Sequence, residues 1–174
     1  MDDDPIELRG RTWHGERLGP AHFAPNSELV DLTLTECDVI GVLADKSRIE
    51  RVSITNSRVR GTTWAGGVVR GVVLDNVTGA DLSFRFSTLR SVTIRDSQLP
   101  GLDFTNVEFE EVRFEGCTLH GAVFDHARVR SLRIEGCDLA GATGVINLRG
   151  ASIDLDAALS IAPNLARESG LLVD

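Results

Sequence analysis

The chain has 174 residues, of which 42% are hydrophobic, 25% charged and only 5% aromatic, a composition typical of one soluble globular or repeat domain. Its 26 acidic and 18 basic residues give a formal net charge of −8, which argues against a basic nucleic-acid-binding surface and against acidic partners. No apolar run approaches the roughly 20 residues of a membrane span, and the start Met1-Asp2-Asp3-Asp4-Pro5 is unlike a secretory signal. We therefore expect a cytoplasmic protein that binds neither nucleic acid nor membrane.

The cysteines and histidines do not indicate a metal or redox site, and no common catalytic motif is present. Cys37, Cys117 and Cys137 form no CxxC pair and have no histidine at ligand spacing. We expect free, buried thiols, no metal site and no cofactor. The sequence also lacks GxSxG, GxxxxGK and HExxH motifs, so we assign no catalytic residue and expect a protein that is not an enzyme.

Residues 1–26 carry an early, displaced form of the pattern that governs the rest of the chain. Leu8, Trp13, Leu18 and Phe23 lie five residues apart, but one residue out of phase with the later series. We expect an irregular N-terminal segment and a first coil that closes one end of the core.

A five-residue repeat governs residues 27–153. Every fifth residue from Leu29 to Leu139 is large and apolar at 21 of 23 positions, and the residues two places earlier form a second, uncharged series that contains all three cysteines. A period of five fits a short extended piece with two inward side chains, followed by a corner. Glycine is frequent at the corner position, two places after the large residue: Gly41, Gly61, Gly66, Gly71, Gly101, Gly116, Gly121, Gly136 and Gly141.

A second period, four of these units long, lies over the first. It predicts stacked core columns of matched side chains, as a solenoid requires. One column is largely aromatic and the other largely aliphatic: Ala44, Trp64, Phe84, Phe104 and Phe124, and Ile54, Leu74, Ile94, Phe114 and Ile134.

Three positions depart from this regular pattern. Ala44 is small beneath Trp64, which predicts that a large neighbour fills the space. Gly79 replaces a large core residue and predicts a local bulge or constriction. Phe86 falls at an outward position.

Several units resemble the pentapeptide-repeat family, whose motif is A(D/N)LXX, although many units here replace the alanine by Ser, Val or Leu. The resemblance covers about 115 residues and implies an all-β solenoid, a right-handed quadrilateral β-helix with four pentapeptides per coil. The units that carry it include Cys117-Thr118-Leu119-His120-Gly121, Ala122-Val123-Phe124-Asp125-His126 and Cys137-Asp138-Leu139-Ala140-Gly141.

The C-terminal part of the chain changes its period. A one-residue slip gives a last set of inward residues: Ile146, Leu148, Ala151 and Ile153. Residues 154–174 then show helical spacing, with Asp154 or Asp156 as the N-cap. Pro163 either breaks this helix or begins a second turn that ends near Gly170.

This short C-terminal helix is expected to cap the solenoid. In the mycobacterial fluoroquinolone-resistance members of the family the corresponding segment also forms the dimer, so the resemblance implies a homodimer. The expected cap and dimer residues are Leu155, Leu159, Ile161, Leu165, Leu171 and Leu172.

Two functions from different classes remain open. The resemblance implies a DNA mimic, a negatively charged rod that occupies the DNA-binding saddle of DNA gyrase and changes sensitivity to quinolones or toxins. The layout is closest to the loop-free mycobacterial type, because no insertion interrupts the coils. The alternative is an interaction scaffold for an unidentified protein partner, since a fold alone does not fix function.

The expected partner-binding residues form an acidic stripe on one wall of the solenoid, the wall centred on Leu34, Ile54, Leu74, Ile94, Phe114 and Ile134. Arg95, Arg113 and Arg133 partly neutralise it. The wall centred on Leu29, Ile49, Val69, Leu89, Phe109 and Val129 carries six acids and six arginines and is balanced. The acidic stripe consists of Glu36, Asp75, Asp96, Glu115 and Glu135.

Overall fold

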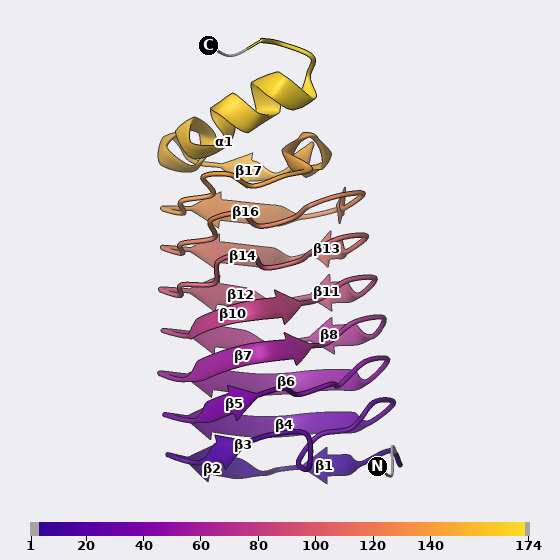
Figure 1. Ribbon diagram of the computed structural model, residues 1–174. Helices are drawn as coiled ribbons and strands as arrows, with labels where there is room; N and C mark the ends of the chain where they lie inside the picture. Colours follow the sequence, from indigo (N-terminus) through magenta and orange to yellow (C-terminus); the bar gives the residue numbers. More distant parts are fainter. Residues whose placement is uncertain (1–3, 173–174) are drawn as a thin grey trace.

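The computed structural model describes residues 4–172. It is a β-helix of about seven turns whose coils stack into a rod, with one helix lying across the C-terminal end (Figure 1). The expected all-β solenoid with a C-terminal helical segment is confirmed.

The inward five-residue positions define four walls, numbered in chain order from the wall that contains Leu29. The strands of the first and second walls form one parallel sheet, because β4 and β6 run from one wall into the next. They are β1 (Glu7–Arg9), β2 (Thr12–His14), β4 (Glu28–Thr35), β6 (Arg48–Thr55), β8 (Val68–Arg70), β9 (Val73–Asp75), β11 (Thr88–Arg90), β12 (Thr93–Arg95), β13 (Glu108–Glu110), β14 (Val112–Glu115), β15 (Arg128–Val129), β16 (Leu132–Glu135) and β17 (Ser152–Ile153).

The third and fourth walls are less regular. Four strands form a second parallel sheet there, and single bridges such as Thr118↔Asp138 and Asp103↔Val123 continue the ladder through the later coils. The four strands are β3 (Arg17–Leu18), β5 (Asp38–Ile40), β7 (Arg58–Thr63) and β10 (Thr78–Ser83).

The register between coils confirms the longer period of four units and places the phase changes. In the middle of the rod each residue pairs with the one 20 places later, as Leu74 does with Ile94. The first coil is offset by 21, since Leu8 pairs with Leu29. The last strand is offset by 19, since Ile134 pairs with Ile153. Compared with the regular coil of 20 residues, the first coil is therefore one residue longer and the last is one residue shorter.

The glycine-rich position is the corner of the coil, as the sequence predicts. All nine predicted corner glycines have positive φ, between 57° for Gly61 and 73° for Gly141. Asn56, Asn76 and Asn106 adopt the same left-handed conformation at corners, which asparagine tolerates better than most residues.

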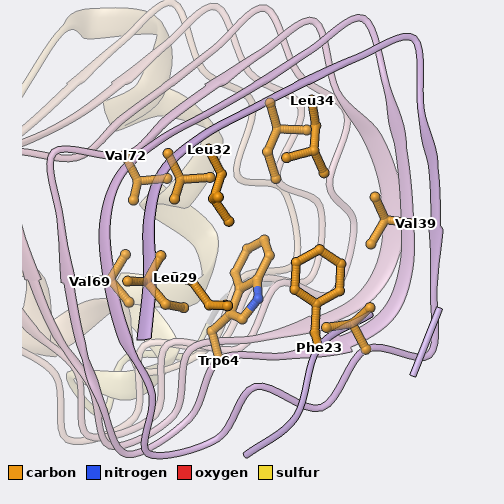
Figure 2. A pocket seen from close by; sticks show the side chains of 12 residues that line it. Phe23, Leu29, Leu32, Leu34, Val39, Trp64, Val69 and Val72 are labelled. Carbon is orange, nitrogen blue, oxygen red and sulfur yellow. The ribbon is translucent and has the colours of Figure 1, made fainter. Parts of the chain in front are cut away.

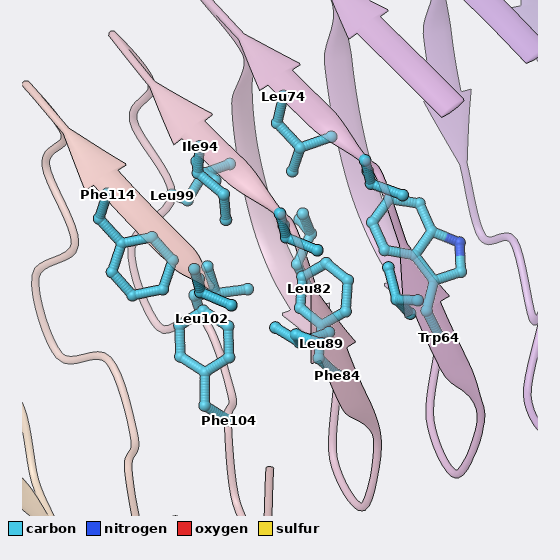
Figure 3. Packing of buried hydrophobic residues seen from close by; sticks show 14 of the residues in the cluster. Trp64, Leu74, Leu82, Phe84, Leu89, Ile94, Leu99, Leu102, Phe104 and Phe114 are labelled. Atoms are coloured by element: carbon cyan, nitrogen blue, oxygen red, sulfur yellow. The ribbon is translucent and has the colours of Figure 1, made fainter. Parts of the chain in front are cut away.

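The two predicted columns lie in the core together with inward residues of the other walls (Figure 3). Phe104 has no exposed surface, and its ring stacks on Phe84 at 5.8 Å and on Phe124 at 5.4 Å between centroids. Phe109 and Phe114 also pack against Phe104, at 5.2 and 5.3 Å. An aromatic cluster thus lies in the C-terminal half of the rod.

Serine and cysteine residues of the second inward series satisfy backbone groups at the corners. The Ser57 hydroxyl accepts a hydrogen bond from the Cys37 N–H one coil below, and Ser97 does the same for Val77, both at 3.0 Å. These N–H groups would otherwise be buried without a partner, at a cost of about 1–3 kcal/mol each. Small polar residues at this position therefore support the fold.

The N-terminal coils pack less tightly. Ala44 is buried. The rings of Trp64 and Phe23 lie beside each other in this part of the core (Figure 2). An apolar cavity of about 30 Å³ remains between these rings and the aliphatic side chains around them. The packing of the core is therefore incomplete in the N-terminal coils.

Gly79 does not cause the expected bulge. Thr78, Gly79 and Ala80 pair with the residues 20 places earlier, so the wall continues in register. A Cβ on Gly79 would lie 2.5 Å from the Val59 carbonyl oxygen and about 3 Å from the side chains of Leu82 and Leu99. Neighbouring leucines thus occupy the volume of the missing side chain.

The C-terminal end differs from the prediction at Ile146. A short 3-10 helix, η1 (Val145–Leu148), turns Val145 and Leu148 into the core and leaves Ile146 exposed. The expected inward orientation of Ile146 is wrong because the extended alternation ends one turn earlier than the sequence pattern indicates. Ile153, on the last strand β17, is also exposed, so it is not the inward core residue that the sequence predicts, and this expectation is wrong as well.

Helix α1 (Leu155–Glu168) is longer than the pattern predicts. Asp154 is its N-cap, and its side chain accepts a hydrogen bond from the Ala157 N–H. Pro163 lies inside the helix and does not break it. Gly170 ends it at φ 85°, where the Gly170 and Leu171 N–H groups bond back to the carbonyls of Arg167 and Ala166 in the Schellman pattern.

Replacing Phe104 tests the inward phase of the repeat. Phe104→Ala is expected to lower the free energy of unfolding by about 3–5 kcal/mol, because it removes a fully buried ring and leaves a cavity. Chemical denaturation followed by circular dichroism measures this change. Phe86→Ala, at an exposed position, is the matched control and should change stability little. Equal effects of the two substitutions would contradict the core assignment.

The thiols provide a second test. Cys37, Cys117 and Cys137 are free and buried, and the Cys137 sulfur accepts a hydrogen bond from the Cys117 N–H at 3.4 Å. The neighbouring Cys137 side chain and burial raise the pKa of the Cys117 thiol. We expect almost no reaction with a thiol reagent in the native protein and three reactive thiols after denaturation without reductant. Fewer than three would indicate a disulfide.

Candidate functional site

The structure places the acidic stripe in two adjacent columns. Asp75, Glu115 and Glu135 lie at the ends of β9, β14 and β16, in register with Arg95 of β12. Glu36 and Asp96 lie in the next column, at corners between the second and third walls with φ of 56° and 50°. All five side chains point outward, so the structure brings them to one edge of the rod, although Glu36 is separated from the others along its axis.

Ion pairs reduce the free charge of the stripe. The Asp75 Oδ2 lies 2.6 Å from Arg95 Nη2, and the Glu135 Oε1 lies 2.9 Å from Arg133 Nε. Glu36 lies 3.8 Å from the His14 Nε2. Among residues 4–172, Asp96 and Glu115 make no ion pair. The most available negative charge is therefore in the C-terminal half of the stripe.

The first wall shows the predicted balance of charge. Arg48 bonds to Glu28 on one coil and to Glu50 on its own strand, while Arg51 bonds to Asp31 and Glu50. The hydrogen bond from Arg48 holds the pKa of the Glu50 carboxyl below its usual value. Ion pairs thus link neighbouring coils at the N-terminal end of this wall.

The cap residues separate into two faces of α1. Ile161 is 5% exposed and packs, with Ala157, against the end of the solenoid. Leu155 and Leu159 are 72% and 63% exposed, on another face of the helix. Leu165, Leu171 and Leu172 are also exposed. The helix therefore caps the core through Ile161 and presents a separate apolar face to solvent.

Asp154 fixes the start of this helix on the last coil. Its carboxylate accepts hydrogen bonds from the Ala157 N–H at 2.9 Å and the Gly136 N–H at 2.6 Å, and these two bonds lower its pKa. The Glu168 carboxylate, near the other end of α1, accepts from the N–H groups of Gly144 and Ile146. Both ends of the helix are thus tied to the solenoid.

One exposed feature was not recognised as a site from the sequence. Phe86, Val68 and several basic residues surround a groove at the corner between the fourth and first walls, although the first wall as a whole is balanced in charge. Part of this site can be found in the sequence, because Lys46, Gly66 and Phe86 are 20 residues apart, the length of one coil. That they lie beside the arginines of the first wall becomes apparent only in the folded structure.

Within residues 4–172, no three histidine, cysteine or carboxylate side chains cluster as metal ligands would. No helix in the same range has the length and hydrophobicity needed to cross a membrane.

Residues 103–141 match the family described as pentapeptide repeats, in eight copies. The chain contains pentapeptide repeats. The same five-residue geometry continues in register through the coils before residue 103. No curated protein matches the sequence significantly.

Several solved structures resemble this one at low sequence identity. Rfr23 from the cyanobacterium Cyanothece 51142 is 16% identical, with a TM-score of 0.47, over 71% of this chain and 88% of its own. QnrB1, a plasmid-mediated fluoroquinolone resistance protein, is 13% identical, with a TM-score of 0.39, over 97% and 100%. HetL, involved in heterocyst differentiation regulation in Nostoc sp. strain PCC 7120, is 14% identical, with a TM-score of 0.30, over 84% and 76%.

The exposed face of α1 gives a test of the predicted homodimer. Leu155→Glu combined with Leu159→Glu should convert a dimer into a monomer without unfolding, because both side chains point to solvent in the single chain. Analytical ultracentrifugation at several concentrations measures the mass. Ile161→Glu is the contrasting variant, and it should destabilise the fold because Ile161 is buried. A monomeric parent protein would end the dimer hypothesis.

Proposed function

We propose that this protein acts by binding another protein through the outer walls of its solenoid, and not by catalysing a reaction. Proteins of pentapeptide repeats are generally structural or interaction proteins. Here the inward side chains fill the core, while charged side chains project from backbone that is hydrogen-bonded to the coils on either side. Stacked repeats of this kind form rigid, extended binding surfaces.

The specific candidate is a DNA mimic that binds DNA gyrase through the acidic stripe. The observation that supports it is that Asp75, Asp96, Glu115 and Glu135 present one outward carboxylate on each of four successive coils, in two adjacent columns along one edge of the rod, with coils about 4.8 Å apart. Such a stripe would offer negative charge to the cationic surface on which a topoisomerase holds DNA. Binding there would change sensitivity to quinolones or toxins. The fold likeness to QnrB1 adds no weight to this candidate.

A scaffold for a different protein partner is the second candidate, and one observation favours it. Arg95, Arg113 and Arg133 lie in or beside the stripe, and two of them form ion pairs with its carboxylates. Mixed charge suits a partner surface that carries both signs. Complementarity of this kind gives specificity more than affinity.

Neutralising the stripe separates the two candidates. Glu36, Asp75, Asp96, Glu115 and Glu135 are replaced together by Gln or Asn, which should leave the fold intact because all five point outward. If the parent protein inhibits gyrase supercoiling, the variant should lose at least about tenfold in potency, and the parent's inhibition should weaken as salt rises.

The control removes the same amount of charge elsewhere. Glu7, Glu16, Asp81, Asp125 and Asp156 are exposed and lie outside the stripe. Their neutral variant should inhibit as the parent does, and circular dichroism should be unchanged for all three proteins. No effect of the parent on gyrase, or equal inhibition by the stripe variant, would exclude the DNA mimic and leave the scaffold.

A further inference from the structure

A groove of about 580 Å³ lies at the corner between the fourth and first walls, diagonally opposite the corner that carries Glu36 and Asp96. It crosses the three strands β6, β8 and β11, which are paired in register. Gly66 and Gly67 form its floor. A Cβ on Gly67 would lie 2.3 Å from the Ser47 carbonyl oxygen, so a larger residue cannot replace Gly67 without moving the backbone. Lys46 and Phe86 stand on the coils on either side of this bare corner.

The groove is cationic although the chain is acidic. Lys46, Arg48, Arg70 and Arg90 line it, and Glu50 is the one carboxylate among the residues that line it. Glu50 is already shared between Arg48 and Arg51. Local positive charge therefore remains.

Two of the cations are available to a ligand. Within residues 4–172, Lys46 and Arg70 form no ion pair. Arg90 differs from these two, because its Nε lies 2.8 Å from Glu110 Oε2 in an ion pair. That carboxylate oxygen is buried and accepts no hydrogen bond. Lys46 and Arg70 can thus bind an anion without first releasing a carboxylate.

Phe86 is an unexpected residue for its position. It has a φ of 60°, in the left-handed region that is a genuine outlier for bulky residues, and its side chain is 59% exposed. Gly66 and Asn106 occupy the same corner on the neighbouring coils and adopt this backbone more easily. Exposure and strain both oppose phenylalanine here, so the fold alone does not account for this residue.

Phe86 shares its groove with a second exposed apolar residue. Val68, 46% exposed, lines the same groove. The Arg85 guanidinium lies over the Phe86 ring, 5.5 Å from its centre, and Arg85 is in turn 3.5 Å from Asp103. This contact supports the ring while leaving more than half of the side chain exposed. An exposed aromatic residue among arginines is typical of the central residues of protein interfaces.

The two sides of Phe86 differ in charge. A second hollow on the fourth-wall side is lined by Asp45, Asp81 and Asp103. Asp45 and Asp103 already accept hydrogen bonds from the protein, from Thr63 and Ala65 and from Thr105. Of the two sides of Phe86, only the groove over Gly66 and Gly67 is therefore electrostatically favourable for an acidic ligand.

We propose that this groove binds an acidic segment of a partner protein, which places an apolar side chain against Phe86 and Val68 and its carboxylates near Lys46, Arg70 and Arg90. Net charge alone argues against an acidic partner, but binding depends on the charges that surround the site. The groove and the acidic stripe lie at opposite corners, so this proposal does not depend on gyrase binding.

The test selects short peptides from a random displayed library, with the full chain as the target. Enriched peptides should be acidic and should carry an aromatic or branched aliphatic residue. Synthetic versions should bind at least about tenfold more weakly to Phe86→Asn and to Arg70→Glu, as measured by fluorescence anisotropy. Binding to the five-residue stripe variant should be no weaker than to the parent.

Thermal unfolding shows whether Phe86 is a binding or a structural residue. Phe86→Asn should keep or raise the melting temperature, because asparagine tolerates the left-handed backbone. His126→Asn, at the same corner two coils later with a φ of 56°, is the matched control and should bind peptides as the parent does.

Three results of the binding experiments would overturn the proposal. They are a failure to enrich any peptide, enrichment of neutral or basic peptides, and equal binding by the parent and both groove variants. A marked fall in the melting temperature of Phe86→Asn would also overturn it, since the ring would then have a structural role. Failure of the gyrase assay has no bearing on any of these outcomes.

Discussion

The constant step of one coil between hydrogen-bonded neighbours is the constraint on which this structure depends. Each coil must return to the same position one strand spacing further along the axis. The chain must therefore change direction once in every pentapeptide, which makes four corners per coil. A left-handed corner in almost every pentapeptide achieves this. Two side chains of each pentapeptide then point inward. The stacked columns, the buried serines and the outward charges all follow from that geometry. Residues one coil apart in the sequence become spatial neighbours.

The periodicity of the sequence predicted the part of the structure in which one coil repeats every 20 residues. Phe104 and Leu74 could be placed in their columns because a five-residue phase decides which side chains enter the core. The prediction failed where the period stops, since Ile146 lies in a 3-10 turn and Pro163 lies inside a helix. The bulge that the sequence allowed at Gly79 is absent, and leucines from other pentapeptides occupy the space of the missing side chain.

Charge on this rod is decided locally. The sequence predicted an acidic stripe that arginines partly neutralise and a first wall of balanced charge. The structure adds which carboxylates of the stripe are paired, and that cations collect around Gly66. Neither effect can be obtained from composition, because each depends on which residues share a column and which side chains meet across a corner. Phe86 illustrates this point, since its neighbours in the groove come from three coils. Sequence alone showed it only as a single outward aromatic.

The uneven packing along the rod has a consequence for its motions. In a stack each coil contacts only its neighbours, so the free energy of opening a coil is a local quantity. The coils around Phe104 share a dense aromatic cluster, whereas those around Trp64 enclose a cavity. Amide hydrogen exchange should therefore be slowest near Phe104 and faster toward the first coil. The rod would fray from its N-terminal end, while α1 holds the other end closed.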